Sequence, residues 1–190
     1  MTVQPVTIWG EPVLHRRAAE VNEFNDELRT IIADMFETND AANGVGLAAP
    51  QIGVGLRIFV YDYENDDDVP ARGVVVNPVL TTSKVSGAAP DPDDEVEGCL
   101  SFPGEHYPLK RAEWVRVTGF DGDGNPVNFE ATGWFARVMQ HEYDHLDGYL
   151  YVNKLNDRYA KKAMRHAKKA GWGVPGLTWM PGVDEDPFGH

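Results

Sequence analysis

The chain has 190 residues and a formal net charge of −13, and 42% of its residues are hydrophobic. This length and composition suit one domain with a core large enough to fold without disulfide bonds. The acidic balance disfavours general nucleic-acid binding, and no apolar run is long enough to span a membrane. The N-terminal residues lack the basic and apolar regions of a signal peptide, and the single cysteine fits a reducing compartment. We therefore expect a cytoplasmic protein.

The first predicted helix begins near Asn25, whose side chain can accept a hydrogen bond from a free backbone N–H of the first turn. Asp26 and Glu27 follow at the positive end of the helix dipole. The helix then carries one apolar stripe with spacings of three and four residues, formed by Leu28, Ile31, Ile32, Met35 and Phe36. A glycine-rich stretch follows at residues 43–55.

Four runs rich in β-branched and aromatic residues predict strands, at residues 57–62, 73–80, 114–121 and 126–132. The acidic, proline-containing segments between them are typical of exposed loops. Acidic residues gather most densely at 62–68 and 91–97.

Residues 121–125 are similar to the start of a calcium-binding loop. However, Pro126 stands where such a loop needs a glycine, and Thr132 stands where it needs a glutamate. We interpret the segment as a tight turn that joins two strands.

The C-terminal third predicts two more helices, at residues 135–147 and 156–170, with Gly148 ending the first of them. The tail at 171–190 is rich in glycine and proline and carries three large aromatic residues. From the sequence, this tail is either loosely ordered or packed on the surface.

The strongest chemical signal is His-Glu-Tyr-Asp-His at residues 141–145, on the second predicted helix. His141 and His145 are four residues apart, so they lie on one face of a helix and can bind the same metal ion. Glu142 lies beside the first ligand, where it can act as general base on a metal-bound water. The polar face of an ordinary amphipathic helix would explain the same residues, because short motifs also occur by chance.

A catalytic metal site of this type needs a third protein ligand. The known protease patterns do not supply one, because Tyr151 stands at the third histidine position and the next glutamate after Glu142 is Glu185 in the tail. We therefore expect an upstream ligand, and Cys99 is the best candidate because thiolates bind first-row metals strongly. A lone cysteine is more often a small buried side chain, and His106 stays an alternative ligand.

The glycine-rich segment at residues 44–51 permits close approach of its backbone to a ligand. Gln51 ends this segment and offers an amide donor that could stabilise an oxyanion. By itself, the segment is equally typical of a turn that leads into a strand.

Three segments, in this order, resemble motifs of the bacterial, iron-dependent peptide deformylase family: Gly-Val-Gly-Leu-Ala-Ala-Pro-Gln at 44–51, Glu-Gly-Cys-Leu-Ser at 97–101 and Gln-His-Glu-Tyr-Asp-His at 140–145. The similarity extends from about residue 5 to residue 155. It implies an α+β fold in a single domain, with antiparallel β-sheets around a central metal-bearing helix. We expect the catalytic domain at 1–170, followed by the tail at 171–190.

The resemblance implies an enzyme that removes the formyl group from the N-terminal formylmethionine of newly synthesised proteins and releases formate. Its substrates would be N-formylmethionyl peptides and nascent chains. It implies one Fe²⁺ per chain, with Zn²⁺ or Ni²⁺ as substitutes, held by Cys99, His141 and His145.

The resemblance also implies roles for the remaining site residues. A metal-bound water would attack the formyl carbon, with Glu142 as general base and then general acid. Gln51 and the Leu100 backbone N–H would form the oxyanion site, and Glu97 and Arg111 would form a supporting ion pair.

The family further suggests how a substrate could lie in the site. An extended peptide could pair through its backbone with Val45–Gly46 and with the strand-like segment near Gly98. Val45, Leu100 and Val138 could line an apolar pocket for the methionine side chain. Ordinary core packing would explain any one of these three residues almost equally well.

The third predicted helix has a charge opposite to that of the whole chain. Its cations recur at spacings of three and four residues, at Arg158, Lys161, Lys162, Arg165 and Lys169. The opposite stripe is apolar and can pack on the domain, with Leu155, Tyr159, Ala163, Ala167 and Ala170. A solvated face with cations near the helix C-terminus is one explanation. The other is docking on ribosomal RNA, because some deformylases that resemble this chain use a C-terminal helix in that way.

Two other functions share the histidine motif. A small zinc peptidase would use the same chemistry to cleave internal peptide bonds. A structural metal site would need a fourth protein ligand, and the chain has no second cysteine.

Overall fold

The computed structural model describes residues 2–63 and 72–188. Most of the predicted acidic loop at 62–68 therefore lies outside the described residues. In the described part, the helices are α1 (Asp26–Ala41), α2 (Gly133–Leu146) and α3 (Asp157–Lys169), with short 3-10 turns at Pro12–His15, Ala49–Ile52 and Tyr151–Lys154. The strands are β1 (Val6–Thr7), β2 (Gly46–Ala48), β3 (Ile58–Asp62), β4 (Arg72–Thr82), β5 (Val96–Cys99), β6 (Phe102–Pro108), β7 (Trp114–Phe120), β8 (Pro126–Thr132) and β9 (Thr178–Trp179).

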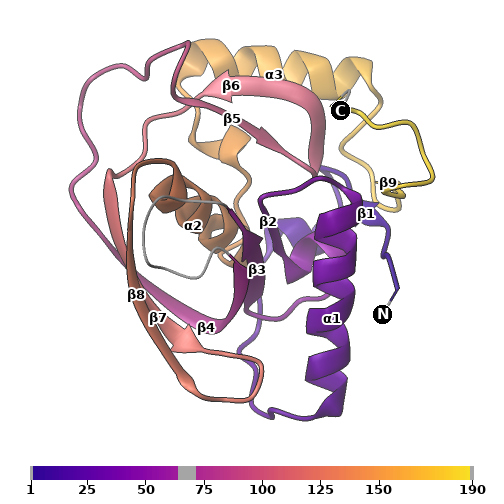
Figure 1. The fold of residues 1–190 in the computed structure, drawn as a ribbon. Coiled ribbons are helices and arrows are strands. Elements are labelled where there is room, and N and C mark those ends of the chain that lie inside the picture. The colour runs from indigo at the N-terminus through magenta and orange to yellow at the C-terminus, as the bar shows by residue number, and fades with distance from the viewer. Residues whose placement is uncertain (1, 64–71, 189–190) are drawn as a thin grey trace.

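The strands form antiparallel sheets, which confirms the predicted α+β class. Five of them make one sheet in the order β2-β3-β4-β7-β8, while β5 pairs with β6 and β1 pairs with β9. Helix α2 lies at the centre of the fold and packs against all five strands of the large sheet (Figure 1). Helix α3 packs against β6 on the other side of α2.

Strand β3 shows why the large sheet is covered on both faces. Successive side chains of a strand point to opposite faces, so an uninterrupted apolar run is buried twice. Phe59 and Tyr61 pack in the cluster that α2 covers, whereas Ile58 and Val60 pack in the cluster that α1 covers. This explains why 58–61 has no polar alternation.

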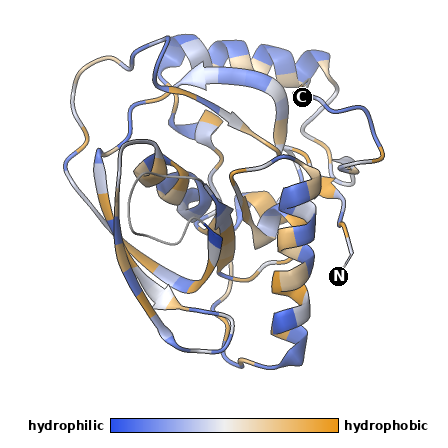
Figure 2. Ribbon diagram, viewed as in Figure 1, coloured by the Kyte–Doolittle hydropathy of each residue, from blue (hydrophilic) through white to orange (hydrophobic). Residues whose placement is uncertain are grey.

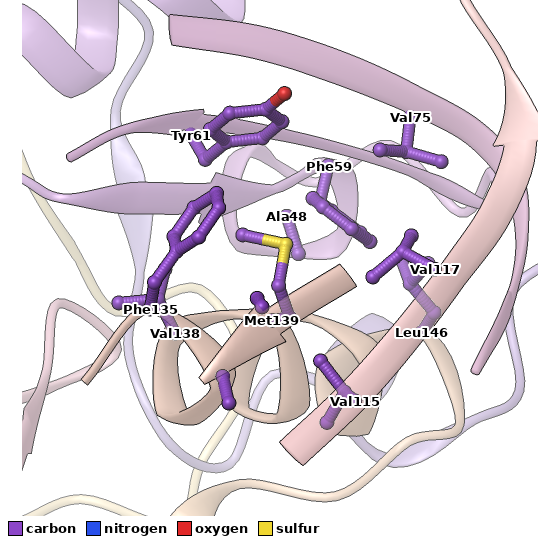
Figure 3. Packing of buried hydrophobic residues seen from close by; sticks show 12 residues of the cluster. Ala48, Phe59, Tyr61, Val75, Val115, Val117, Phe135, Val138, Met139 and Leu146 are labelled. Carbon is purple, nitrogen blue, oxygen red and sulfur yellow. The ribbon is translucent and has the colours of Figure 1, made fainter. Parts of the chain in front are cut away.

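The apolar stripe of α2 fixes the helix against the sheet. Phe135 points toward Tyr61, while Met139 and Leu146 point toward Phe59 and Val117 (Figure 3). Each of the three α2 side chains is at most 2% exposed, and burying one of this size contributes about 1.5–3 kcal/mol. Because one face of α2 is held in this way, its other face presents the histidine motif in a fixed orientation.

The three predicted helices are confirmed. The Asn25 side chain accepts a hydrogen bond from the Leu28 N–H at 3.0 Å, as expected for an N-cap. Helix α2 begins two residues earlier than predicted, and Gly148 follows its end with a positive φ of 82°. Asn156 caps α3 by accepting from the backbone N–H groups of the first turn.

The four predicted strands are also confirmed, with small changes at their ends. The segment at 121–125 is the turn between β7 and β8, and the Asp121 carboxylate accepts from the Asp123 and Asn125 N–H groups. Strands β1, β2, β6 and β9 were not predicted, and β5 corresponds to the strand-like segment expected near Gly98.

The described part of the tail packs against the body of the protein. Val6 in β1 pairs with Trp179 in β9, and the Trp172 ring meets the Phe102 ring edge-on at 4.9 Å. Surface packing, rather than a loose tail, therefore describes 171–188 (Figure 1). The domain boundary at residue 170 stays a prediction. Among the described residues, none of the helices has the length and apolar character needed to cross a bilayer.

Candidate metal centre and active site

Three potential metal ligands converge at the centre of the molecule. Cys99 ends β5, while His141 and His145 lie one turn apart on α2. One donor atom from each residue lies within 4.8 Å of the others, and Cys99 Sγ is 3.3 Å from His145 Nε2. His106, the alternative third ligand, does not belong to this cluster. The geometry therefore places Cys99 with the two histidines.

The surroundings orient both imidazoles. His141 Nδ1 lies 3.0 Å from a Glu97 oxygen, which leaves His141 Nε2 for a metal. Burial lowers the pKa of His145 well below its usual value, so that ring is neutral and can donate a lone pair. Burial also acts to lower the pKa of His141, but the nearby Cys99 and Glu97 outweigh it and raise that pKa.

The donor set fits a first-row transition metal. One thiolate and two imidazoles are typical ligands of zinc and iron, whereas calcium and magnesium prefer oxygen. Within the part of the chain that the structure describes, no fourth histidine, cysteine or carboxylate joins the cluster. A three-ligand site keeps a position open for water or substrate, as catalytic sites do.

Glu97 lies at the centre of a buried ion network behind His141. It accepts hydrogen bonds from Arg111 Nε at 2.8 Å and from Arg111 Nη2 at 2.9 Å. Burial alone would raise the pKa of Glu97, but the Arg111 charge and its hydrogen bonds hold that pKa far below its ordinary value. Arg111 also donates to Asp144 on α2 at 2.5 Å. The predicted ion pair of Glu97 and Arg111 is therefore present, and it ties β5 to the ligand helix.

Arg137 is a member of this network that sequence reasoning missed. It donates from Nη1 to Glu97 and to the Leu109 carbonyl, both at 2.7 Å, and it is 7% exposed. A signal was present in the sequence, because Arg137 precedes His141 by four residues and so shares its helix face. Two arginines, not one, neutralise Glu97.

The Glu142 carboxylate is buried beside the ligands. Its Oε2 atom is fully buried and has no hydrogen-bond partner in the structure. Burial raises the pKa of Glu142 to about 7. A Cβ added to Gly46 would lie 2.7 Å from Glu142 Oε1, so the backbone at Gly46 can approach the carboxylate only as glycine.

The side chain of Gln51 points into the same site. Its Oε1 accepts from the Ala48 N–H at 2.8 Å, which fixes the amide so that Nε2 lies 3.9 Å from Cys99 Sγ. Gln51 is 1% exposed. The amide donor therefore faces the metal centre, and Leu100, the residue after Cys99, lines the same pocket.

A pocket opens to solvent directly above these groups. It brings together most of the predicted site residues: Val45, Gly46, Gln51, Glu97, Gly98, Cys99, Leu100, Val138, His141 and Glu142. The predicted residues His145 and Arg111 do not line the pocket, and both are buried. Sequence reasoning missed several further wall residues: Ala42, Trp134, Arg137 and Phe188.

An open three-ligand centre, a buried carboxylate and an accessible pocket together define a catalytic metal centre of the metallohydrolase class. Comparison with known proteins gives the family. Residues 3–161 match the family model described as polypeptide deformylase. The chain is 56% identical over 194 residues to the peptide deformylase of Rhodococcus opacus, which covers 100% of this chain and 99% of that protein. Over 197 residues it is also 56% identical to the peptide deformylase of Mycolicibacterium paratuberculosis, with 100% of both chains covered.

Solved structures agree. The peptide deformylase of Thermus thermophilus superposes with a TM-score of 0.75 at 39% identity, covering 88% of this chain and 94% of that one. The Ehrlichia chaffeensis enzyme in complex with actinonin gives a TM-score of 0.78 at 31% identity, covering 90% and 98%. The chain belongs to the peptide deformylase family.

Proposed function

We propose that this chain hydrolyses the formyl group from N-terminal formylmethionine of newly synthesised proteins, using the pocket above Cys99, His141 and His145. The observation that carries the proposal is the meeting of an open three-donor centre with the buried Glu142 carboxylate in one accessible pocket. Family membership supports the same activity. Cytoplasm is the proposed compartment, because the substrates are made there.

Cys99, His141 and His145 would hold one divalent ion, which we propose to be Fe²⁺, with Zn²⁺ or Ni²⁺ as substitutes. Such an ion supplies Lewis acidity: it polarises a carbonyl oxygen and lowers the pKa of water. Glu97 supports the centre by accepting from the Nδ1 side of His141, which fixes the ring.

Glu142 moves the proton. It accepts a proton from the attacking water as the new carbon–oxygen bond forms at the formyl carbon. It then gives this proton to the departing amine as the carbon–nitrogen bond breaks, which leaves formate and a free N-terminus. A pKa near neutrality suits a group that must both accept and donate at pH 7.

The oxygen of the formyl group gains negative charge as water attacks. Gln51 Nε2 and the Leu100 backbone N–H would donate to this oxygen. The Gln51 amide is held in place by the Ala48 N–H, so it needs little reorganisation when the charge develops.

The substrate would bind as an added strand. Strand β2 is an edge of the five-stranded sheet, and among the described residues β5 pairs with β6 alone, so both can offer backbone groups to a peptide. Val45–Gly46 and Gly98 line the pocket at these two edges. Val138 is buried at the pocket wall, next to the ligand face of α2, and suits contact with the methionine side chain.

The test of this proposal is formate release from formyl-Met-Ala-Ser, compared with cleavage of an unformylated peptide that has several internal bonds. A deformylase releases formate and leaves the second peptide intact. Cleavage of internal bonds would indicate a zinc peptidase, and a metal-loaded protein that does neither would indicate a structural site.

We also propose that α3 docks on ribosomal RNA. The outward surface of α3 is mostly hydrophilic (Figure 2), and its cations Arg158, Lys161, Lys162, Arg165 and Lys169 are exposed. The opposite stripe packs on the domain through the buried Ala163 and Ala167. Ala170, which was expected in that stripe, is exposed because the helix ends at Lys169. An exposed basic face on an acidic chain supports binding to the phosphates of ribosomal RNA, close to where the nascent chain emerges.

A further inference from the structure

A buried asparagine of α1 holds the segment that leads into β2. Asn39 lies in the last turn of α1, which packs against β2 (Figure 1), and it is 0% exposed. Its side-chain amide donates from Nδ2 to the Gly44 carbonyl at 2.7 Å, and its backbone carbonyl accepts from the Gly44 N–H at 2.9 Å. Asn39 therefore binds both backbone groups of Gly44, as a paired residue of a neighbouring strand does.

Gly44 stands directly before the edge on which the substrate peptide is proposed to pair. It lines the catalytic pocket together with Val45 and Gly46, and β2 begins at Gly46. On the side of the large sheet, the Val45 carbonyl accepts from the Asp62 N–H at 3.0 Å. The segment is thus held by β3 along its length and by Asn39 at its start.

The oxygen of the Asn39 amide is buried without compensation. Its Oδ1 atom is fully buried and has no hydrogen-bond partner among the described residues. A buried acceptor without a partner destabilises a fold, and an apolar side chain would avoid this loss. Stability alone therefore does not account for an asparagine at this position.

The same oxygen explains why residue 44 is a glycine. A Cβ added to Gly44 would lie 2.4 Å from Asn39 Oδ1 and 3.3 Å from Leu100 Cδ1, and the φ of Gly44 is not in the left-handed region. The close approach of the two residues, rather than the backbone conformation, therefore requires a glycine. We call these two residues the Asn39–Gly44 clamp.

We propose that Asn39 is a positioning residue for the substrate, because its clamp on Gly44 sets the path of Val45–Gly46 along the pocket. The inference rests on the proposed deformylase function and adds a residue that does not itself line the pocket. A peptide pairs more tightly with an edge that is already fixed, since a mobile edge loses conformational entropy on binding. Gly46 also lies against Glu142, where an added Cβ would be 2.7 Å from Oε1. A fixed edge therefore holds the bound peptide at a constant place relative to this carboxylate.

The experiment compares formyl-Met-Ala-Ser with formylmethioninamide, which has no further residue to pair with the edge. Asn39→Leu removes the amide and keeps the branched shape of the side chain, and Asn39→Ala removes the amide without crowding Gly44. In both variants kcat/KM for formyl-Met-Ala-Ser should fall by about three- to tenfold through KM, the effect of one hydrogen bond. The kcat/KM for formylmethioninamide and the metal content should stay at the parent level.

Asn77 offers a matched control. Its side chain also binds both backbone groups of one residue, because Oδ1 accepts from the Val21 N–H and Nδ2 donates to the Val21 carbonyl, each at 2.9 Å. Neither residue lines the catalytic pocket. Asn77→Ala should therefore lower Tm and leave KM unchanged for both substrates.

A second measurement tests the coupling between the two residues of the clamp. Gly44→Ala should raise KM for formyl-Met-Ala-Ser in the parent, because the new Cβ displaces the Asn39 amide. In the Asn39→Ala background the same change meets no Oδ1 atom, so it should raise KM by a smaller factor.

Three results would overturn the positioning role. KM for formyl-Met-Ala-Ser could be unchanged in both Asn39 variants. Both substrates could lose kcat/KM by the same factor together with a lower Tm, as in a purely structural role. Gly44→Ala could raise KM by the same factor in both backgrounds. Failure of the parent to release formate from formyl-Met-Ala-Ser would instead overturn the proposed function.

Discussion

The charge network behind the metal centre and the basic face of α3 differ in burial. Behind the metal centre, Glu97 is 3% exposed at its side chain and is held by Arg111, Arg137 and His141. On α3, the five cations of the basic stripe are exposed. A buried, multiply bonded charge fixes geometry, because each lost partner leaves another charge desolvated and unpaired. Exposed charges are screened by salt and act mainly over distance. Substitutions in the first cluster should therefore change folding and catalysis, whereas those in the second should change only association.

The largest effect is expected at Cys99, the proposed metal ligand at the end of β5. Cys99→Ala leaves two imidazoles, so metal affinity should fall by more than the roughly 10- to 100-fold that loss of an outer-sphere partner costs. Metal analysis after dialysis against a weak chelator measures this. Because iron held by a thiolate is open to oxidation, the iron form of the parent should lose activity in peroxide, and nickel should relieve the part due to metal oxidation. Retention of metal at the parent level by Cys99→Ala would make His106 or another residue the ligand.

The next largest effect is expected at Glu142, whose buried Oε2 atom has no hydrogen-bond partner among the described residues. Glu142→Gln should keep its metal but lose formate release by roughly two or more orders of magnitude, as expected for a lost general base. Glu130→Gln, at an exposed ion pair with Arg116, is the matched control and should behave like the parent. Near-normal turnover of metal-loaded Glu142→Gln would remove Glu142 from the mechanism.

Glu142 also predicts a pH dependence. Only the ionised carboxylate can accept a proton, and burial raises its pKa to about 7 in the absence of metal. The kcat/KM of the parent should therefore fall as pH decreases through this pKa, and a bound cation should move the fall to lower pH. A pH profile of kcat/KM for the metal-loaded enzyme measures this fall at low pH, which should disappear in Glu142→Gln. A flat profile down to pH 4 would contradict the role of Glu142.

A smaller effect is expected at Glu97, which forms ion pairs with both Arg111 and Arg137. Glu97→Ala removes the carboxylate that two buried guanidinium groups share, and leaves Arg111 with Asp144 and Arg137 with Glu95 as acidic partners. This loss should cost about 3–5 kcal/mol in the free energy of unfolding. Because the folded pKa of Glu97 is strongly depressed, its stabilisation is full above the unfolded value of about 4.3, begins to fall below that pH and is lost as pH falls through the much lower folded pKa. Urea unfolding at pH 7 and pH 4 measures both. Equal stability of Glu97→Ala and the parent at pH 7 would show that the network does not stabilise the fold.

The smallest effect on catalysis is expected at the exposed cations of α3. Reversal of Lys161, Lys162 and Arg165 to glutamate should leave formyl-peptide turnover unchanged, because none of these residues lines the pocket. Ribosome co-sedimentation should be lost, and that of the parent should weaken steeply as salt rises. Unchanged sedimentation of the triple variant at low salt would contradict docking.

Short sequence patterns predicted the helices and strands that are stabilised by interactions between residues close together in the chain. The cap at Asn25, the helix range 156–170 and the run at 126–132 matched α1, α3 and β8 closely. Strands β1 and β9 are two residues each and exist only because segments far apart in the chain pair. Gly98 and Pro103 interrupt β5 and β6, so β5 was expected only as a strand-like segment near Gly98 and β6 had no strand pattern. Only tertiary packing creates them.

The site residues divide in the same way, into those with a local sequence signal and those that are placed by tertiary packing. The histidine spacing predicts a metal on α2 by itself, and the absence of a downstream ligand pointed to Cys99. Arg137 was missed although its spacing from His141 offered a signal. Phe188 had no signal at all, because its place in the pocket depends on how the tail folds back along β1.

The most direct test of the account is a titration of metal-free protein with Fe²⁺ under nitrogen, with formate release from formyl-Met-Ala-Ser as the readout. We expect no formate release without metal, a linear rise with added Fe²⁺ and a plateau at one equivalent per chain. Release that is independent of metal, or a loaded protein that frees no formate, would contradict it.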